Sequence, residues 1–217
     1  MDTVAARQNT IDSQVRPWGG LNDLANHALQ DIPREVFVPK AYQNLAFADI
    51  EIPLTDKAKM FSPKLEGRLL STLNIQQHET ALEIGTGSGY LTAVLAKLGQ
   101  SVVSVEIDAN LSAQAAEKLQ SLGIKNVRLE VGDATSGWTS NDFFDVVVIG
   151  SAVPKITTHY LHWLSVGGRL FVVEGSGAVM SAKCITRINQ HQWQTQSLFE
   201  THLDTMQGLE TPVGFTF

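Results

Sequence analysis

The chain has 217 residues, of which 43% are hydrophobic and 18% charged, a balance typical of a globular protein with one larger α/β domain. Lys and Arg number 16 against 22 Asp and Glu, and the formal net charge of -6 disfavours duplex nucleic acid as a partner. The single cysteine, Cys184, excludes an intramolecular disulfide and a multi-thiolate zinc site.

The first 78 residues predict a helical region that prolines interrupt repeatedly. No apolar run reaches the roughly 18 residues that cross a bilayer, and residues 1–8 lack the features of a signal peptide, so we expect a cytoplasmic protein without membrane contact. Ser62 and Pro63 predict the start of a helix, because serine accepts a backbone N–H bond and proline loses no needed donor there. The expected buried stripe of that helix is Leu65, Leu69, Leu70 and Leu73.

Beyond residue 80, short β-branched runs alternate with Ala- and Leu-rich segments, which indicates βαβ units and a parallel sheet. The expected strands are residues 80–85, 101–107, 127–131, 144–150 and 169–174. The expected crossover helices are residues 90–98, 110–122 and 157–164, which end at Gly99, Gly123 and Gly167-Gly168. We expect Gly99 and Gly123 to take the left-handed conformation that commonly ends a helix.

The last forty residues change to antiparallel signals. Residues 184–189 and 193–201 predict a hairpin, and residues 211–217 alternate like an edge strand. The sequence therefore predicts an α/β fold of the Rossmann-like, doubly wound type, with a mostly parallel sheet, a C-terminal antiparallel hairpin and an N-terminal helical extension.

A glycine-rich turn between the first expected strand and helix is the most informative segment. Glu83 precedes the turn, which contains Gly85, Thr86, Gly87, Ser88 and Gly89. Glycines let a backbone turn sharply and approach a ligand closely, and amides at a helix start can receive a carboxylate or phosphate. A dinucleotide fingerprint would place its third glycine at position 90, which is tyrosine, and an acidic residue before the turn suits an amino group better than a pyrophosphate. The spacing therefore favours S-adenosylmethionine over a nicotinamide dinucleotide.

The ends of three further strands are expected to meet at the same crevice. Glu106 and Ile107 end the second strand, where an acidic side chain can accept both ribose hydroxyls. Asp133 and Ala134 follow the third strand, where Asp133 could accept a bond from an adenine amino group. Ser151 follows the fourth strand, either at the place of a methyl acceptor or in a simple strand-to-helix turn.

Several segments resemble the protein-L-isoaspartate O-methyltransferase family, over nearly the whole chain. Residues 82–90 match its L-E-I-G-T-G-S-G-Y, and residues 32–39 and 45–49 resemble its V-P-R-x-x-F-V-P and L-A-Y-x-D. The resemblance implies methyl transfer from S-adenosylmethionine to a carboxylate of a damaged aspartyl residue in a protein or peptide. It also implies one domain over residues 1–217, with residues 1–78 on the substrate side and residues 79–217 as the cofactor-binding core.

The segment that shapes the isoaspartate pocket of the family differs in this chain. The family carries P-L-P-x-G-x-G-Q-T-I-S-x-P, and alignment to Pro63 places Phe61 on the serine, and Thr55 and Lys57 on the two glycines. Either the loop shifts and brings Ser62 to the site, or Phe61 fills the pocket and selects a flatter, less polar acceptor.

Phe61, Ser62 and Ser151 are therefore the candidate catalytic residues. Two alternatives to the family activity stay open. One is methyl transfer to another acceptor, such as a small molecule, and the other is a protein that binds S-adenosylmethionine without catalysis.

Two polar clusters have ordinary explanations beside functional ones. His159 and His162 stand at a metal-chelating spacing, but no third ligand follows nearby, so we expect a packed or solvated pair and no metal site. Asp56, Lys57 and Lys59 either face the substrate or belong to a solvated loop.

Overall fold

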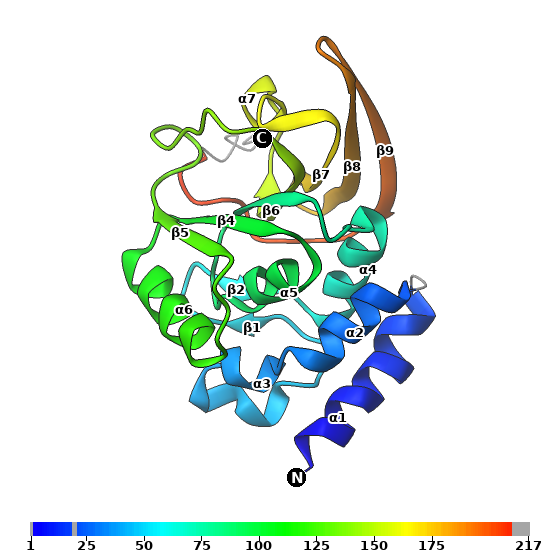
Figure 1. Ribbon diagram of the computed structural model, residues 1–217, viewed down its shortest axis with the longest axis vertical. Helices are drawn as coiled ribbons and strands as arrows, with labels where there is room; N and C mark the ends of the chain where they lie inside the picture. Colours follow the sequence, from blue (N-terminus) through cyan, green and yellow to red (C-terminus); the bar gives the residue numbers. More distant parts are fainter. Residues whose placement is uncertain (1, 19–20, 210–217) are drawn as a thin grey trace, which may run out of the picture.

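The computed structural model describes residues 2–18 and 21–209. Its N-terminal region is helical and prolines divide it, as the sequence predicts. Helix α1 (Thr3–Thr10) continues through a π-helical turn (Ile11–Val15) into a 3-10 turn (Arg16–Trp18). Helices α2 (Asp23–Asp31) and α3 (Arg34–Phe37) and a further 3-10 turn (Lys40–Leu45) follow, packed below the sheet in Figure 1.

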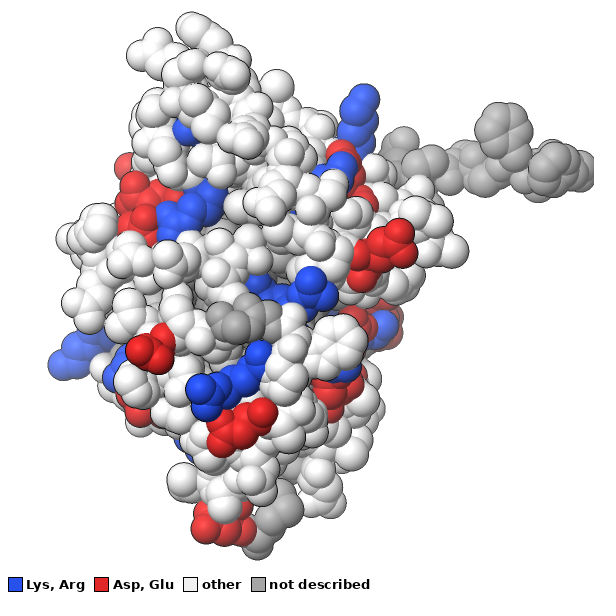
Figure 2. All heavy atoms as spheres, turned by 90° about the vertical axis from the view of Figure 1, so that its right-hand side faces the viewer, with Lys and Arg blue, Asp and Glu red and all other residues white. Residues whose placement is uncertain are grey.

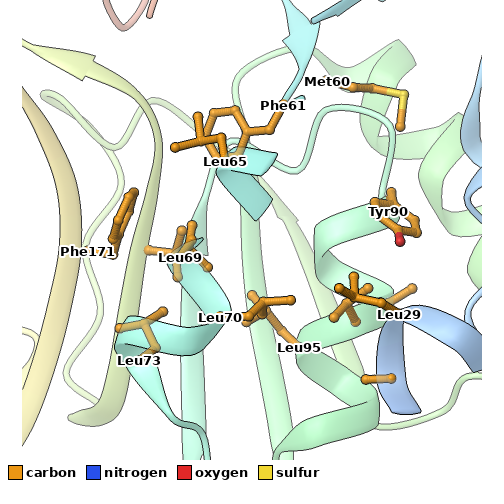
Figure 3. Close-up of a cluster of buried hydrophobic side chains, with 14 of the residues drawn as sticks. Leu29, Met60, Phe61, Leu65, Leu69, Leu70, Leu73, Tyr90, Leu95 and Phe171 are labelled. Carbon is orange, nitrogen blue, oxygen red and sulfur yellow. The ribbon is translucent and has the colours of Figure 1, made fainter. Parts of the chain in front are cut away.

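A short hairpin and helix α4 connect this region to the sheet. The hairpin pairs β1 (Ile52–Pro53) with β2 (Lys59–Met60), and α4 spans Pro63–Leu73. Helix α4 begins as expected, because the Oγ atom of Ser62 accepts the N–H of Leu65 at 3.5 Å. All four expected leucines are buried. Figure 3 shows Leu69 and Leu73 facing Phe171 of the sheet while Leu70 faces Leu95 of α5.

A seven-stranded sheet in the order β5-β4-β3-β6-β7-β8-β9 forms the centre of the molecule. The strands β5, β4, β3, β6 and β7 pair in parallel, and β8 and β9 add antiparallel pairs, which confirms the expected fold class. The strands are β3 (Thr80–Ile84), β4 (Ser101–Glu106), β5 (Val127–Val131), β6 (Phe144–Val153), β7 (Leu164–Ser176), β8 (Val179–Asn189) and β9 (Gln192–Glu200). The helices between them are α5 (Tyr90–Leu98), α6 (Ala109–Ser121) and α7 (Thr158–Leu161).

Both faces of the sheet are covered, which explains the continuous apolar run of β6. Val146 and Val148 point into a core shared with α2, α4 and α5, whereas Val147 and Ile149 point into a second core that contains Trp163. All four β6 side chains are fully buried, as expected for a strand between two layers. The first core also includes side chains of the N-terminal helices, so this region packs directly on the sheet.

The helix expected over residues 157–164 is wrong in length. Helix α7 ends at Leu161, and Leu164 already pairs with Phe144 as the first residue of β7. The two glycines do not stop a helix but lie inside β7. A Cβ atom on Gly168 would lie 2.9 Å from the carbonyl oxygen of Phe144, so close strand packing explains this glycine.

Of the smaller expectations, two are corrected by the structure and one concerns residues that the structure does not describe. Gly99 has an extended backbone with φ -100°, and a Cβ atom there would lie 2.8 Å from the Glu79 carbonyl oxygen, so contact with the chain and not a left-handed turn explains it. Gly123 does adopt the left-handed conformation, with φ 69°. The final hairpin starts earlier than expected, at Val179, and the expected edge strand at 211–217 lies outside the described residues.

In the described part, the structure contains no helix that combines the length and apolar character needed to cross a membrane.

Candidate active site

A cleft opens at the carboxyl ends of β3, β4, β5 and β6, and contains about 810 Å³ not filled by atoms, part of it open to solvent. The predicted residues that line it are Gly85, Gly87, Glu106, Ile107, Asp133, Ala134, Ser151 and Phe61. A smaller cavity adjoins it behind the glycine turn and is lined by Glu83, Thr86 and Ser88. Gly89 and Ser62 line neither space.

The glycine turn has the backbone that only glycine adopts readily. The φ angles of Gly85, Gly87 and Gly89 are 95°, 53° and 84°. Gly89 serves packing, because a Cβ atom there would lie 2.9 Å from the Cβ atom of Ala115 on α6. Gly85 and Gly87 instead leave backbone exposed at the cleft.

The Glu106 carboxylate is fixed against this turn. Its Oε2 atom accepts the N–H of Gly87 at 2.7 Å, and its Oε1 atom accepts the N–H of Asp108 at 3.1 Å. The side chain is buried but lines the cleft. Each carboxylate oxygen can accept more than one bond, so both oxygens retain capacity for a hydroxyl of a ligand.

Glu83 is a buried carboxyl group with one engaged oxygen. Its Oε2 atom accepts hydroxyl bonds from Thr92 at 2.5 Å and Ser104 at 2.6 Å. Burial raises the pKa of Glu83 to about 8, against the lowering effect of these two bonds. Its Oε1 atom accepts no hydrogen bond from the residues that the structure describes. The side chain therefore presents an available oxygen at the smaller cavity.

Asp133 and Ala134 follow β5, and both residues form hydrogen-bonding contacts with their neighbours. The Oδ1 atom of Asp133 accepts the hydroxyl of Thr135 at 2.6 Å and its N–H at 2.8 Å, and the hydroxyl bond is the main reason that the pKa of Asp133 is lowered. The carbonyl oxygen of Ala134 lies 3.0 Å from the Nε2 atom of His159, whose ring packs against Trp163. This agrees with a packed His159, and within residues 2–18 and 21–209 no three His, Cys, Asp or Glu side chains form a metal-binding group.

Phe61 lines the cleft and is anchored through its backbone. Its carbonyl oxygen accepts a bond of 2.7 Å from Arg34, whose guanidinium also donates to both carboxylate oxygens of Glu66 at 2.5 Å. Arg34 and Glu66 are each 3% exposed, and burial raises the pKa of Glu66 to about 7 while Arg34 opposes the rise. Figure 3 shows the Phe61 ring beside Leu65 at the start of α4. With Ser62 engaged in the helix cap, this wall of the cleft presents Phe61 at the position where the family segment has its serine.

No sequence motif predicted the residues that form the rest of that wall. Residues 203–207 follow β9 back across the sheet and line the cleft. The N–H of Ala152 donates to the Asp204 carbonyl at 2.9 Å, and the N–H of Met206 donates to the Ala152 carbonyl at 2.8 Å. Lys59 completes the wall, and its Nζ atom lies 2.8 Å from the Oδ2 atom of Asp204. Lys57 and Lys59 both line the cleft, which agrees with a substrate-facing cluster, whereas Asp56 does not line it.

The model of the family described as Protein-L-isoaspartate(D-aspartate) O-methyltransferase (PCMT) matches residues 8–204. The chain belongs to this family. A PCMT of Syntrophobacter fumaroxidans is 38% identical over 78% of this chain and 79% of its own length. One of Syntrophotalea carbinolica is 32% identical over 92% of both chains. A Plasmodium falciparum protein named for the same activity, and crystallised with S-adenosyl-L-homocysteine, superposes with a TM-score of 0.80 over 94% of this chain and 98% of its own, at 16% identity.

As a PCMT family member, the chain is an O-methyltransferase with S-adenosylmethionine as its cofactor. The residues at the cleft fit that cofactor. The exposed backbone at Gly85 and Gly87, the oriented Glu106 carboxylate and the available oxygen of Glu83 offer acceptors for hydroxyl and ammonium groups in two adjoining spaces.

Proposed function

We propose that the protein transfers the methyl group of S-adenosylmethionine to the carboxylate of an altered aspartyl residue in a damaged protein or peptide. One observation carries this proposal. The glycine turn and the segment 57–61, which takes the place of the family's isoaspartate-pocket segment, line the same cleft. A cofactor and an acceptor can therefore meet there.

The cofactor roles follow the positions of the predicted residues. Glu83, Gly85, Thr86, Gly87 and Ser88 would surround the methionine part, with Gly89 setting the start of α5 behind them. Glu106 would hold the ribose hydroxyls and Ile107 would contact the adenosine beside them. Asp133 and Ala134 would lie at the adenine, although Asp133 already accepts bonds from Thr135 and Ser136.

The reaction asks for positioning and exclusion of water more than for proton transfer. S-adenosylmethionine, when bound, supplies an electrophilic methyl group on a positively charged sulfur. An acceptor carboxylic acid with a pKa of about 4 is already ionised at neutral pH, so no general base is needed. Phe61 and Met60 provide an apolar wall that removes water from an acceptor oxygen, and orientation of this kind can supply roughly 7–11 kcal/mol.

A second candidate function has support from the same wall. A phenylalanine ring cannot donate a hydrogen bond to a carboxylate, so the pocket also suits a flatter and less polar acceptor, which includes a small molecule. Ser151 lines the cleft and would lie beside either acceptor, whereas Ser62 would act only through the helix cap.

We also propose the kind of partner that the protein acts on and its location. The partner is a peptide or protein with a modified aspartyl residue, or the small acceptor above, and not nucleic acid or a membrane. On the face formed by β9 and α4, Lys and Arg are interspersed with Asp and Glu, unlike the continuous basic surface that duplex nucleic acid requires (Figure 2). A cytoplasmic location stays a prediction.

The test uses labelled S-adenosylmethionine and a matched pair of peptides that contain isoaspartate or normal aspartate at one position. We expect base-labile label on the isoaspartyl peptide alone, because a methyl ester hydrolyses in mild base. Absence of label on both peptides, with S-adenosylhomocysteine still bound in calorimetry, would instead support another acceptor. A protein that binds the cofactor but labels no acceptor of any class is the non-catalytic alternative.

A further inference from the structure

Lys59 lies where the two parts of the site meet. The residue lines both the main cleft and the smaller cavity behind the glycine turn, together with Met60 and Phe61. It stands on β2 opposite Pro53, two residues before Phe61, and its side chain is 39% exposed. A positive charge therefore reaches the junction between the cofactor side and the acceptor wall.

The ammonium of Lys59 has hydrogen-bonding capacity left over. Its Nζ atom is 2.8 Å from Asp204, a hydrogen-bond distance, but 3.6 Å from the Oε2 atom of Glu51, which is too long. An ammonium group has three donors, so its contact with Asp204 leaves two for a ligand. The hydrogen bond with Asp204 raises the pKa of Lys59, so the group remains charged at neutral pH.

An acceptor carboxylate needs such a donor in this cleft. Phe61 has no hydroxyl, Ser62 caps α4, and the guanidinium of Arg34 is engaged by Glu66 and two carbonyl oxygens. A carboxylate buried against Phe61 and Met60 without a partner would be strongly disfavoured. Lys57 also lines the cleft, but it does not reach the smaller cavity and forms no ion pair with the described residues.

We propose that Lys59 binds the carboxylate of the methyl acceptor and so selects an anionic acceptor over its uncharged amide. The inference rests on the proposed function and adds the residue that replaces the missing hydroxyl. Lys59 holds one carboxylate oxygen and leaves the other for the methyl group. Asp204 holds the Lys59 ammonium at the cleft, and the acceptor carboxylate binds to the same ammonium group. Lys59 is thus a specificity-determining residue.

The experiment measures binding with the demethylated cofactor present, so that no turnover occurs. Calorimetry with saturating S-adenosylhomocysteine gives the Kd of an isoaspartyl peptide and of the same peptide with that carboxylate as a carboxamide. The variants are Lys59→Met, Lys59→Arg and, as matched control, Lys64→Met, because Lys64 is similarly exposed and pairs with Asp49 but lines neither space. We expect Lys59→Met to weaken binding of the acid peptide roughly ten- to a hundredfold, as for a lost hydrogen bond to a charged group, and to leave the amide peptide unchanged.

The controls separate this role from a structural one. Lys59→Arg and Lys64→Met should bind the acid peptide within about threefold of the wild type, and all variants should bind S-adenosylhomocysteine as the wild type does. Equal loss for the acid and amide peptides, or no loss in Lys59→Met, overturns the inference while the proposed function stands. A wild type that binds the cofactor product but no isoaspartyl peptide overturns both.

Discussion

Among the residues of the cofactor side, Glu83 has the most strongly shifted pKa. Burial raises its pKa to about 8, so the folded protein retains a proton that the unfolded chain loses near pH 4.5. Its contribution to stability is therefore full below pH 4.5 and is lost as the pH rises through about 8. At neutral pH the Glu83 carboxyl group is therefore mainly protonated.

The first prediction concerns proton release. S-adenosylhomocysteine carries an ammonium group, which favours the ionised form of a carboxyl group nearby, so its binding at pH 7 should release a proton from Glu83. Calorimetry in two buffers of different ionisation enthalpy measures the number released, which we expect to approach about one per site. Glu83→Gln is the control and should abolish the dependence on buffer. Identical heats in both buffers for the wild type would contradict the role of Glu83.

The second prediction concerns Phe61. The ring is 8% exposed and packs in the core beside Leu65, so Phe61→Ser should leave a cavity and lower the free energy of unfolding by about 3 kcal/mol. The substitution should also fail to give full activity on an isoaspartyl peptide, because Thr55 and Lys57 still differ from the glycines of the family segment. Urea unfolding and kcat/KM measure the two effects. Full isoaspartyl activity in this single variant would disprove the second part.

At the scale of elements, one buried ion pair joins the N-terminal helices to the acceptor wall. Arg34 on α3 reaches Glu66 on α4, the Phe61 carbonyl and the Ala46 carbonyl. Its guanidinium also lies 5.0 Å from the ring centre of Tyr90 at the start of α5. The position of Phe61 therefore depends on the packing of three helices.

The third prediction follows from this pair. Arg34→Met leaves the Glu66 carboxyl group buried without its partner, so the free energy of unfolding should fall by about 3–5 kcal/mol. The KM for the acceptor should rise as well, since the Phe61 carbonyl loses its donor. The double variant Arg34→Met, Glu66→Leu removes both charges and should regain part of the stability in urea unfolding. A loss below about 1 kcal/mol in the single variant would contradict this account.

Local sequence pattern predicted the elements with a clear apolar run or a capped start, and it failed where a glycine serves a contact with a distant part of the chain. The apolar run of β6 and the capped start of α4 appear as expected. The pair Gly167-Gly168 suggested a helix stop, but Gly168 is required by the close approach of the Phe144 backbone, which is distant in sequence. The same holds for Gly99, whose neighbour Glu79 directly precedes β3.

The whole molecule should unfold as one unit. The first core contains residues from Ile11 to Leu203, so the N-terminal helices and the sheet share one interior. The fourth prediction is that, in the unaltered protein, tryptophan fluorescence and far-UV circular dichroism show the same urea midpoint, since the buried Trp138 and Trp163 report the second core while circular dichroism includes the N-terminal helices. Midpoints that differ by more than about 0.5 M at equal slope would contradict a single domain.

The two halves of the site differ in how well the sequence predicted them. The cofactor side comes from strand ends and a glycine turn, whose spacing is local, and the cleft brings Gly85, Glu106 and Asp133 together. Ser104 and Thr92, which hold Glu83, carry no motif. The acceptor side combines a hairpin near residue 59 with residues 203–207, and only the fold brings these distant segments together.

The contacts that hold residues 203–207 in place determine how a bulky substrate can enter the cleft. Two backbone bonds to Ala152 and the contact between Asp204 and Lys59 tie this strip to the body. None of these ties involves the glycine turn. Leu203 and Met206 of this strip are also buried in the two cores, so the strip belongs to the folded body and a polypeptide has to reach the cleft with this wall in place.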